Sequence, residues 1–278
     1  MEKRILTDEM LKGFAAHMTE EERSENTRQY YLRVLRELAA FAGTEPVTKQ
    51  TVIDFKEQLT TSGYTAGTVN TYLSALGSFF DFAGWPELKV RHLKVQPKAY
   101  AAPEELLTLA EYNRMLAAAE SPRLRLLAET LAGTGIRVSE LRFFTVEAIC
   151  RSSFTVTNKG KTREVILVPR LKKKLLRYAL DRGIRSGPIF RTRTGKPLSR
   201  SYIWTELKKL ALRAGVAPGK VFPHNLRKLF ARQFYELKKD IAKLADVLGH
   251  SSINTTRIYI LSSVREHQRG MERMRLVT

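Results

Sequence analysis

Residues that could act on a phosphate lie along the second half of the chain. The stretch LGHSSINTTRIYI places His250 directly after a glycine and Tyr259 nine residues later. A tyrosine hydroxyl is a weak nucleophile while it is protonated, with an ordinary pKa of about 10. A cationic site with a nearby base shifts it toward the phenolate. Taken alone, Tyr259 between two isoleucines also fits a core or interface aromatic.

Two arginine motifs precede this pair. GTGIRVSEL puts Arg137 after a Gly-Thr-Gly turn, at or near a helix start. Backbone N–H groups at a helix start and a guanidinium both suit phosphate oxygens, although an ion pair with Glu140 explains the same arginine. FPHNLRKLFA opens a helix at Pro223 and puts His224 and Arg227 one turn apart on one face. Such a pair also occurs on ordinary solvated helix faces.

A β-hairpin is predicted between these motifs. In FTVTNKGKTREVILVP, two runs rich in β-branched residues, Phe154–Thr157 and Glu164–Val168, flank an Asn-Lys-Gly turn at 158–160. Lys159 lies in this turn, and Lys161 follows two residues later. A turn lysine is usually solvated, and it takes part in chemistry only where the hairpin leans over a phosphate.

The elements that position these residues are mostly helical. Apolar spacing, cap residues and glycine stops predict helices over 24–43, 48–63 and 65–84. Further helices are expected around 171–180, 202–214 and 240–248, from Pro223, and around Tyr259. Prolines 97 and 103 interrupt a short basic stretch. We therefore predict a helical domain at 1–97, a linker at 98–103 and a second domain at 104–278.

The charge distribution points to a polyanionic partner. The chain of 278 residues has a formal net charge of +20. Residues 1–100 carry 13 Lys+Arg and 13 Asp+Glu, whereas residues 101–278 carry 35 and 15. Residues 151–200 alone carry 15 and 2. This excess favours nucleic acid over a merely solvated face.

Other partners and cofactors are not indicated. No apolar run is long enough to cross a membrane, and the N-terminus has no signal-peptide pattern. A cytoplasmic location is therefore expected. The single cysteine, Cys150, excludes an internal disulfide, and its apolar neighbours suggest a half-buried thiol. No carboxylate or cysteine stands at ligand spacing to His224 or His250, so no metal site is expected.

Taken in order, the motifs resemble the tyrosine recombinase family, which includes the Xer recombinases and the phage integrases. The resemblance covers nearly the whole chain. It implies a mainly α fold: an N-terminal helical, SAM-like core-binding domain and a catalytic domain with a small β-hairpin, which together form a C-shaped clamp on DNA. It also implies site-specific recombination through a covalent 3′-phosphotyrosine and a Holliday junction, without metal, ATP or another cofactor.

The resemblance assigns roles to six residues. Tyr259 is the expected nucleophile, and Arg137 and Arg227 are expected to bind the non-bridging oxygens of the scissile phosphate. Lys159 is preferred over Lys161 as the general acid. These residues act with two histidines that complete the expected catalytic set: His224, a proton acceptor or phosphate ligand, and His250.

Several points stay open. The expected partner is double-stranded DNA with an inverted-repeat core site, bound by a dimer that pairs into a tetramer, with accessory DNA-binding proteins undecided. Lys228 stands where the family motif often has histidine, and we interpret it as another phosphate contact.

The tail after Tyr259 either folds on its own domain or docks on a neighbouring subunit. The alternatives are a type IB-like topoisomerase and a non-catalytic DNA-binding protein. The short segment before Ser24 favours a simple Xer-like or transposon recombinase.

Overall fold

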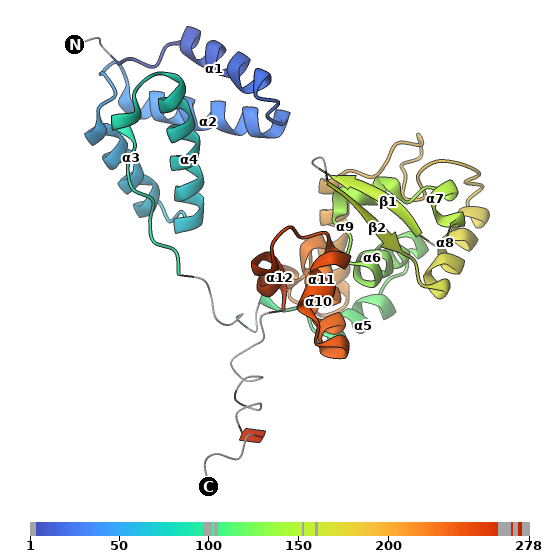
Figure 1. Ribbon diagram of the computed structural model, residues 1–278. Helices are drawn as coiled ribbons and strands as arrows, with labels where there is room; N and C mark the ends of the chain where they lie inside the picture. Colours follow the sequence, from blue (N-terminus) through green and yellow to red (C-terminus); the bar gives the residue numbers. More distant parts are fainter. Residues whose placement is uncertain are drawn as a thin grey trace. The chain divides into compact units, whose positions relative to one another are not determined.

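The computed structural model describes residues 4–96, 102, 105–151, 153–158, 161–260, 268 and 272–273. The chain divides into two compact units, Met1–Pro97 and Lys98–Thr278. In the described part, helices alternate with short connections, and the one sheet is a two-stranded antiparallel hairpin (Figure 1). The predicted fold class, mainly α with a small β-hairpin, is therefore confirmed. No described helix is long and apolar enough to span a membrane.

The first unit is a four-helix arrangement around one apolar core. Its helices begin at threonine or serine caps whose side chains accept a backbone N–H of the first turn. The core contains Phe14, Leu35, Leu76 and Phe79, all fully buried. The elements are α1 (Asp8–Glu20), α2 (Glu25–Ala42), α3 (Lys49–Thr61), α4 (Ala66–Phe82) and the 3₁₀ turn η1 (Pro86–Leu88).

Helix α1 adds one helix to the three that the sequence predicts. Its apolar face is sparse, because only Leu11, Phe14 and Met18 are buried, and Gly13 interrupts it with a poor helix former. Packing supplies what the local pattern lacks: the rings of Phe14 and Phe79 meet edge to face, with centroids 5.4 Å apart. Tertiary contacts thus stabilise a helix whose own pattern is weak.

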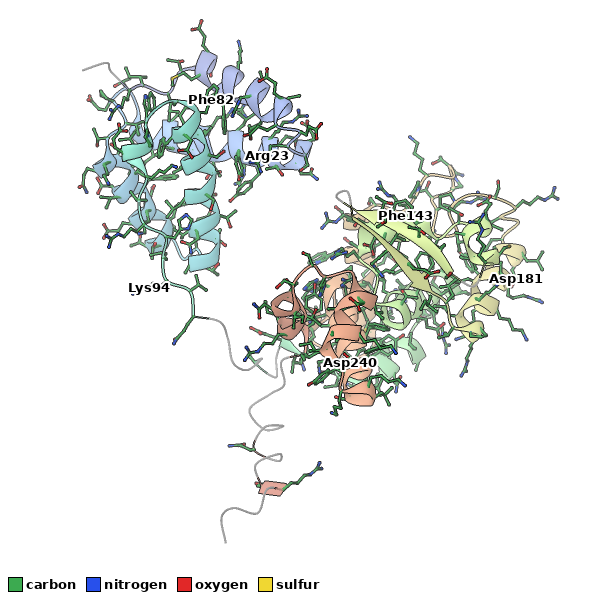
Figure 2. The ribbon with its side chains drawn as sticks, viewed as in Figure 1. Arg23, Phe82, Lys94, Phe143, Asp181 and Asp240 are labelled. Atoms are coloured by element: carbon green, nitrogen blue, oxygen red, sulfur yellow. The ribbon has the colours of Figure 1, made fainter. Side chains whose placement is uncertain are left out.

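The second unit surrounds a larger core that includes Leu131, Leu175, Leu207 and Leu226. Its helices confirm those expected around 171–180, 202–214, 240–248, Pro223 and Tyr259. Figure 2 shows Asp240 at the start of α11, where its carboxylate accepts the Lys243 N–H at 2.9 Å. The elements are α5 (Leu109–Ala117), α6 (Pro122–Thr134), η3 (Val138–Phe143), α7 (Val146–Cys150), β1 (Ser153–Asn158), β2 (Lys161–Ile166), α8 (Pro169–Asp181), α9 (Arg200–Arg213), η4 (Pro218–Lys220), α10 (Pro223–Lys238), α11 (Ile241–Leu248) and α12 (Ile253–Tyr259).

The hairpin is present, but its second strand is displaced from the predicted run. Strand β2 begins at Lys161, opposite Asn158, and ends at Ile166. Val168 is instead the residue before α8, because Pro169 opens that helix and holds its predecessor in an extended conformation. Lys161 thus belongs to a strand. Residue 159 lies outside the described residues.

Two smaller expectations have different outcomes. Cys150 is exposed and not half-buried. Successive helix residues point about 100° apart, so burial of Ile149 does not carry over to the last residue of α7. The expected linker, 98–103, falls outside the described residues except for Ala102.

Candidate active site

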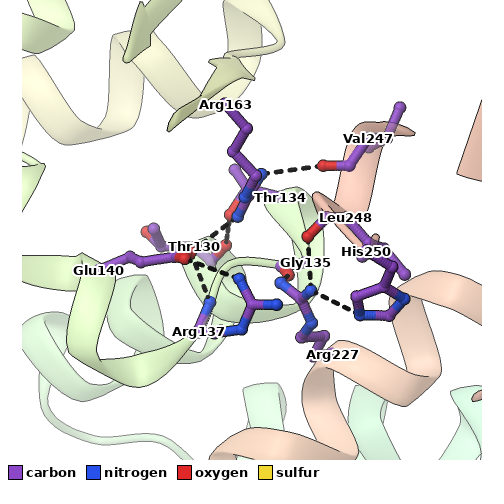
Figure 3. A network of polar contacts seen from close by, with 10 residues as sticks. All are labelled: Thr130, Thr134, Gly135, Arg137, Glu140, Arg163, Arg227, Val247, Leu248 and His250. Atoms are coloured by element: carbon purple, nitrogen blue, oxygen red, sulfur yellow. Dashed lines mark hydrogen bonds and ion pairs between the residues drawn. The ribbon is translucent and has the colours of Figure 1, made fainter. Parts of the chain in front are cut away.

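Five of the six residues singled out from the sequence lie within one site in the second unit. The Tyr259 ring stands edge-on to the rings of His224 and His250, with centroid distances of 4.9 and 4.8 Å. The Arg227 guanidinium carbon lies 5.8 Å from the centre of the same ring. Arg137 lies beside Arg227 in Figure 3, and its charge lowers the pKa of Arg227. Segments that are more than 120 residues apart in the chain therefore meet around one tyrosine.

Arg227 is the buried centre of the site, with 1% of its surface exposed. Its guanidinium donates to Gly135 O at the end of α6, to Leu248 O at the end of α11 (2.6 Å) and to His250 Nε2 (3.0 Å) (Figure 3). These carbonyls carry the partial negative charge of two helix C-termini, which favours a cation. Burial, followed by the charge of Arg137, lowers the pKa of Arg227 to about 10. The side chain therefore stays charged at neutral pH.

Two glycines make this convergence possible. Gly135 and Gly249 end α6 and α11 in the left-handed conformation, with φ of 61° and 64°. A Cβ at Gly135 would collide with the Phe230 ring, and one at Gly249 would collide with the Arg163 side chain. The glycines of the GTG and LGH motifs thus serve both the turn and the close packing of the site.

A buried carboxylate orders the arginines. Glu140, 1% exposed, accepts the Arg137 backbone N–H (2.9 Å) and Arg137 Nη1 (3.1 Å). It also binds Arg163 Nη2 at 2.7 Å. Burial raises the pKa of Glu140, but the Arg163 charge and the Arg137 N–H bonds outweigh it, so the net pKa lies below its usual value. The ion pair between Arg137 and Glu140, which the sequence offers as an alternative explanation for this arginine, is present. The Arg137 side chain still keeps 37% exposure.

Sequence reasoning missed Arg163. It lies opposite Val156 in the hairpin and two residues before Val165, so it shares the face of two buried valines. An arginine at an inward position of a strand was the available signal, because charged residues are almost never fully buried unless they are paired. Besides Glu140, Arg163 donates to Val247 O at 2.9 Å. It therefore ties the hairpin to the end of α11.

The two histidines differ in surroundings. His250 is half-buried, and its Nδ1 lies 2.9 Å from Thr256 Oγ1. Burial, followed by the charges of Arg227, Arg137 and Arg163, lowers its pKa to about 4. His224 is exposed on the first turn of α10. Partial burial, then the charges of Lys228, Arg227 and Arg137, lowers its pKa as well. Both imidazoles are therefore uncharged at neutral pH.

Some expected residues lie beyond this geometry. Lys159 is outside the described residues, and only the backbone of Lys161 is described. The tail residues Val264, Met271 and Met274 also lie outside. Within the described part, no three His, Cys, Asp or Glu side chains are grouped as metal ligands would be.

Comparison with known proteins decides the family. Residues 105–266 match the model of the phage integrase family, and residues 11–87 match the phage integrase N-terminal SAM-like domain. The chain belongs to the phage integrase family. The tyrosine recombinase XerA of Pyrococcus horikoshii is 30% identical over 281 residues, which cover 98% of this chain and 96% of that protein. The resemblance drawn from the motifs and the enzyme class that it implies, tyrosine recombinase, are therefore confirmed.

Solved structures of phage integrase family members share the fold. A λ integrase(75–356) dimer bound to a COC′ core site gives a TM-score of 0.76 at 19% identity, covering 93% of this chain and 96% of that one. A λ integrase tetramer bound to a Holliday junction gives 0.75 at 19% identity, covering 93% and 78%. At these identities the likeness concerns the fold alone.

Proposed function

We propose that the chain is a site-specific DNA recombinase in which Tyr259 attacks a DNA phosphodiester and becomes covalently joined to the 3′-phosphate. The observation that carries this proposal is the surroundings of Tyr259: two neutral imidazoles edge-on to its ring and a buried guanidinium 5.8 Å from the ring centre. A hydroxyl nucleophile beside a guanidinium suits attack on an anionic phosphodiester, because the phosphodiester repels nucleophiles until its negative charge is compensated.

Arg137 and Arg227 would hold the non-bridging oxygens. Arg137 has one guanidinium N–H bound to Glu140 and a side chain that is 37% exposed, which leaves further guanidinium donors free for a phosphate. The Nε of Arg227 is buried and has no partner among the described residues. A buried donor without a partner is costly, and a phosphate oxygen would supply the missing acceptor. The geometry supports a phosphate beside these two arginines.

The reaction would exchange one phosphoester bond for another. The Tyr259 oxygen forms a bond to phosphorus while the bond from phosphorus to the 5′-oxygen breaks. The phenol proton passes to a neutral base, for which His224 is our candidate, and the leaving 5′-oxygen takes a proton from Lys159. A 5′-hydroxyl from a second duplex then attacks the phosphotyrosine and regenerates Tyr259. The bonds broken and made are equivalent, so the cycle needs no ATP.

Both units would take part in DNA binding. We assign 1–97 as the core-binding domain and 104–278 as the catalytic domain, which together close around the duplex. The excess of 35 basic over 15 acidic residues in 101–278 supports phosphate contact there. We further propose an inverted-repeat core site bound by two copies, and a tetramer that passes through a Holliday junction. The shared fold with a λ integrase tetramer on such a junction supports this assembly.

The test starts from DNA that the protein selects. Tyr259→Phe is used to enrich bound sequences from a random duplex pool, and the recovered site is placed twice on a supercoiled plasmid. The wild-type chain should exchange or delete the segment between the sites and form a denaturant-resistant adduct with a nicked copy. Relaxation of a plasmid that has no site would indicate a topoisomerase. Retarded DNA without any adduct would indicate a non-catalytic binder.

A further inference from the structure

The two nitrogens of His250 have different partners, and these partners determine where its proton lies. Nε2 faces Arg227 Nη2 at 3.0 Å, and Nδ1 faces Thr256 Oγ1 at 2.9 Å. A guanidinium has only N–H donors and no acceptor. Nε2 must therefore be the acceptor, and it carries no proton. In a neutral imidazole the single proton is then on Nδ1, and this N–H donates a hydrogen bond to Thr256 Oγ1.

Thr256 is placed to serve this ring. It is fully buried on α12, three residues before Tyr259, and so lies on the same side of that helix. Its exposed neighbour, Thr255, makes no hydrogen bond with His250 in the described part of the chain. A valine at 256 would keep the shape and lose the acceptor, which would leave the Nδ1–H of His250 without a partner.

We propose that Thr256 is a positioning residue: its hydroxyl oxygen accepts a hydrogen bond from the Nδ1–H of His250 and so fixes the imidazole, which stands against the Tyr259 ring, with its Nε2 lone pair toward Arg227. The chain of bonds runs from α12 through His250 to Arg227, which also binds the ends of α6 and α11. These bonds thereby fix the position of α12, which carries Tyr259, relative to Arg227, the arginine proposed to bind the phosphate. His250 enters the site as an acceptor, not as a donor.

The first test reads the proton directly and needs no DNA. The protein is labelled with ¹⁵N-histidine, and the resonances of His250 among the five histidines are assigned by their loss in His250→Gln. The expected result is a protonated, pyrrole-type Nδ1 and an unprotonated, pyridine-type Nε2. The Nδ1–H signal should be protected from exchange in the wild type and in Thr255→Val, and lost to fast exchange in Thr256→Val. A proton on Nε2 in the wild type would overturn the proposal.

The second test rests on the proposed function and measures cleavage. Thr256→Val should slow adduct formation on nicked DNA by about tenfold, the effect of one buried hydrogen bond left unmade, while the Kd for the uncut duplex stays unchanged. Thr256→Ser, which keeps the hydroxyl, should restore the rate, and Thr255→Val should match the wild type. Equal rates for the valine and serine variants at 256 would overturn the role of the hydroxyl. Absence of any adduct in the wild type would refute the recombinase proposal and leave the NMR result standing.

Discussion

Glu140 Oε2 lies 2.7 Å from Arg163 Nη2, and this ion pair joins strand β2 to the turn that carries Arg137. Both side chains are nearly buried, with 1% and 9% exposure. The same Arg163 donates to Val247 O near the end of α11. The hairpin, the Arg137 turn and the segment leading to His250 are thus linked through one buried carboxylate and one arginine.

Removing the charge of Glu140 should therefore be costly. Glu140→Gln leaves Arg163 buried without its counter-charge and should reduce the free energy of unfolding by about 3 kcal/mol, as broken buried ion pairs do. Urea unfolding of the full chain measures this loss. The control is Asp181→Asn, which breaks a 3.0 Å pair between exposed side chains and should cost less than about 1 kcal/mol. Similar losses for the two variants would contradict a special role for Glu140.

Stability should fall as the histidines of the site are protonated. The pKa of His250 is lowered from 6.5 to about 4 in the folded chain. The unfolded chain thus takes up its proton first, so the contribution of neutral His250 is full above pH 6.5 and is lost as the pH falls toward about 4. His250→Gln should show a smaller drop in Tm across this window than the wild type does. His92→Gln, at an exposed position, should show the wild-type drop, and a wild-type drop in His250→Gln would refute the assignment.

Lys159, and not Lys161, should act as the general acid. A general acid matters only while the leaving group is poor, so Lys159→Ala should be slower by about 10²–10⁴-fold on the natural phosphodiester. It should recover when sulfur replaces the bridging 5′-oxygen, because a thiolate leaves without a proton. Lys161 pairs with Asn158 in the strand ladder, and Lys161→Ala should mainly weaken DNA binding. Rescue by sulfur in Lys161→Ala alone would exchange the two roles.

DNA affinity should fall steeply with salt, and most of this salt dependence should come from the second unit. Each phosphate neutralised releases counterions, so the logarithm of the binding constant declines linearly with the logarithm of the salt concentration. The fragment 98–278 should keep most of the slope of the whole chain, because residues 101–278 carry 35 basic and 15 acidic residues. Titration by fluorescence anisotropy gives both slopes. Binding of the fragment 1–97 as tight as that of the whole chain would contradict a dominant role for the charges of the second unit.

The sequence predicts the motif-bearing elements well because their signals are local. Pro223 opens α10 and Gly249 ends α11 through backbone restrictions that each residue carries itself. Helix α1 escapes this reasoning because its stability comes from the contact of Phe14 with Phe79, 65 residues away. The predicted second strand starts at Glu164, beside a run rich in β-branched residues, whereas the ladder begins three residues earlier, at Lys161.

In the active site, too, local signals identify some residues and tertiary contacts determine the rest. Motif order identifies Arg137, Arg227 and Tyr259, but the partners that hold them depend on tertiary structure. Arg163 gives no motif, and its role appears only when β2 packs against Glu140 and α11. Main-chain acceptors such as Leu248 O cannot be predicted from residue type, because every residue has a backbone carbonyl. The burial of Arg227 to 1% exposure follows from these contacts and could not be read from the HxxR spacing.

Mass spectrometry of the adduct shows whether Tyr259 is the residue that becomes covalently joined to DNA. Wild-type protein trapped on nicked site DNA is digested with nuclease and trypsin. Cleavage after Arg257 and Arg265 yields the peptide 258–265, whose one tyrosine is Tyr259. The expected result is a nucleotide mass on Tyr259 in this peptide, no adduct from Tyr259→Phe, and a normal adduct from Tyr235→Phe. A nucleotide on any other residue, or an adduct that persists in Tyr259→Phe, would contradict it.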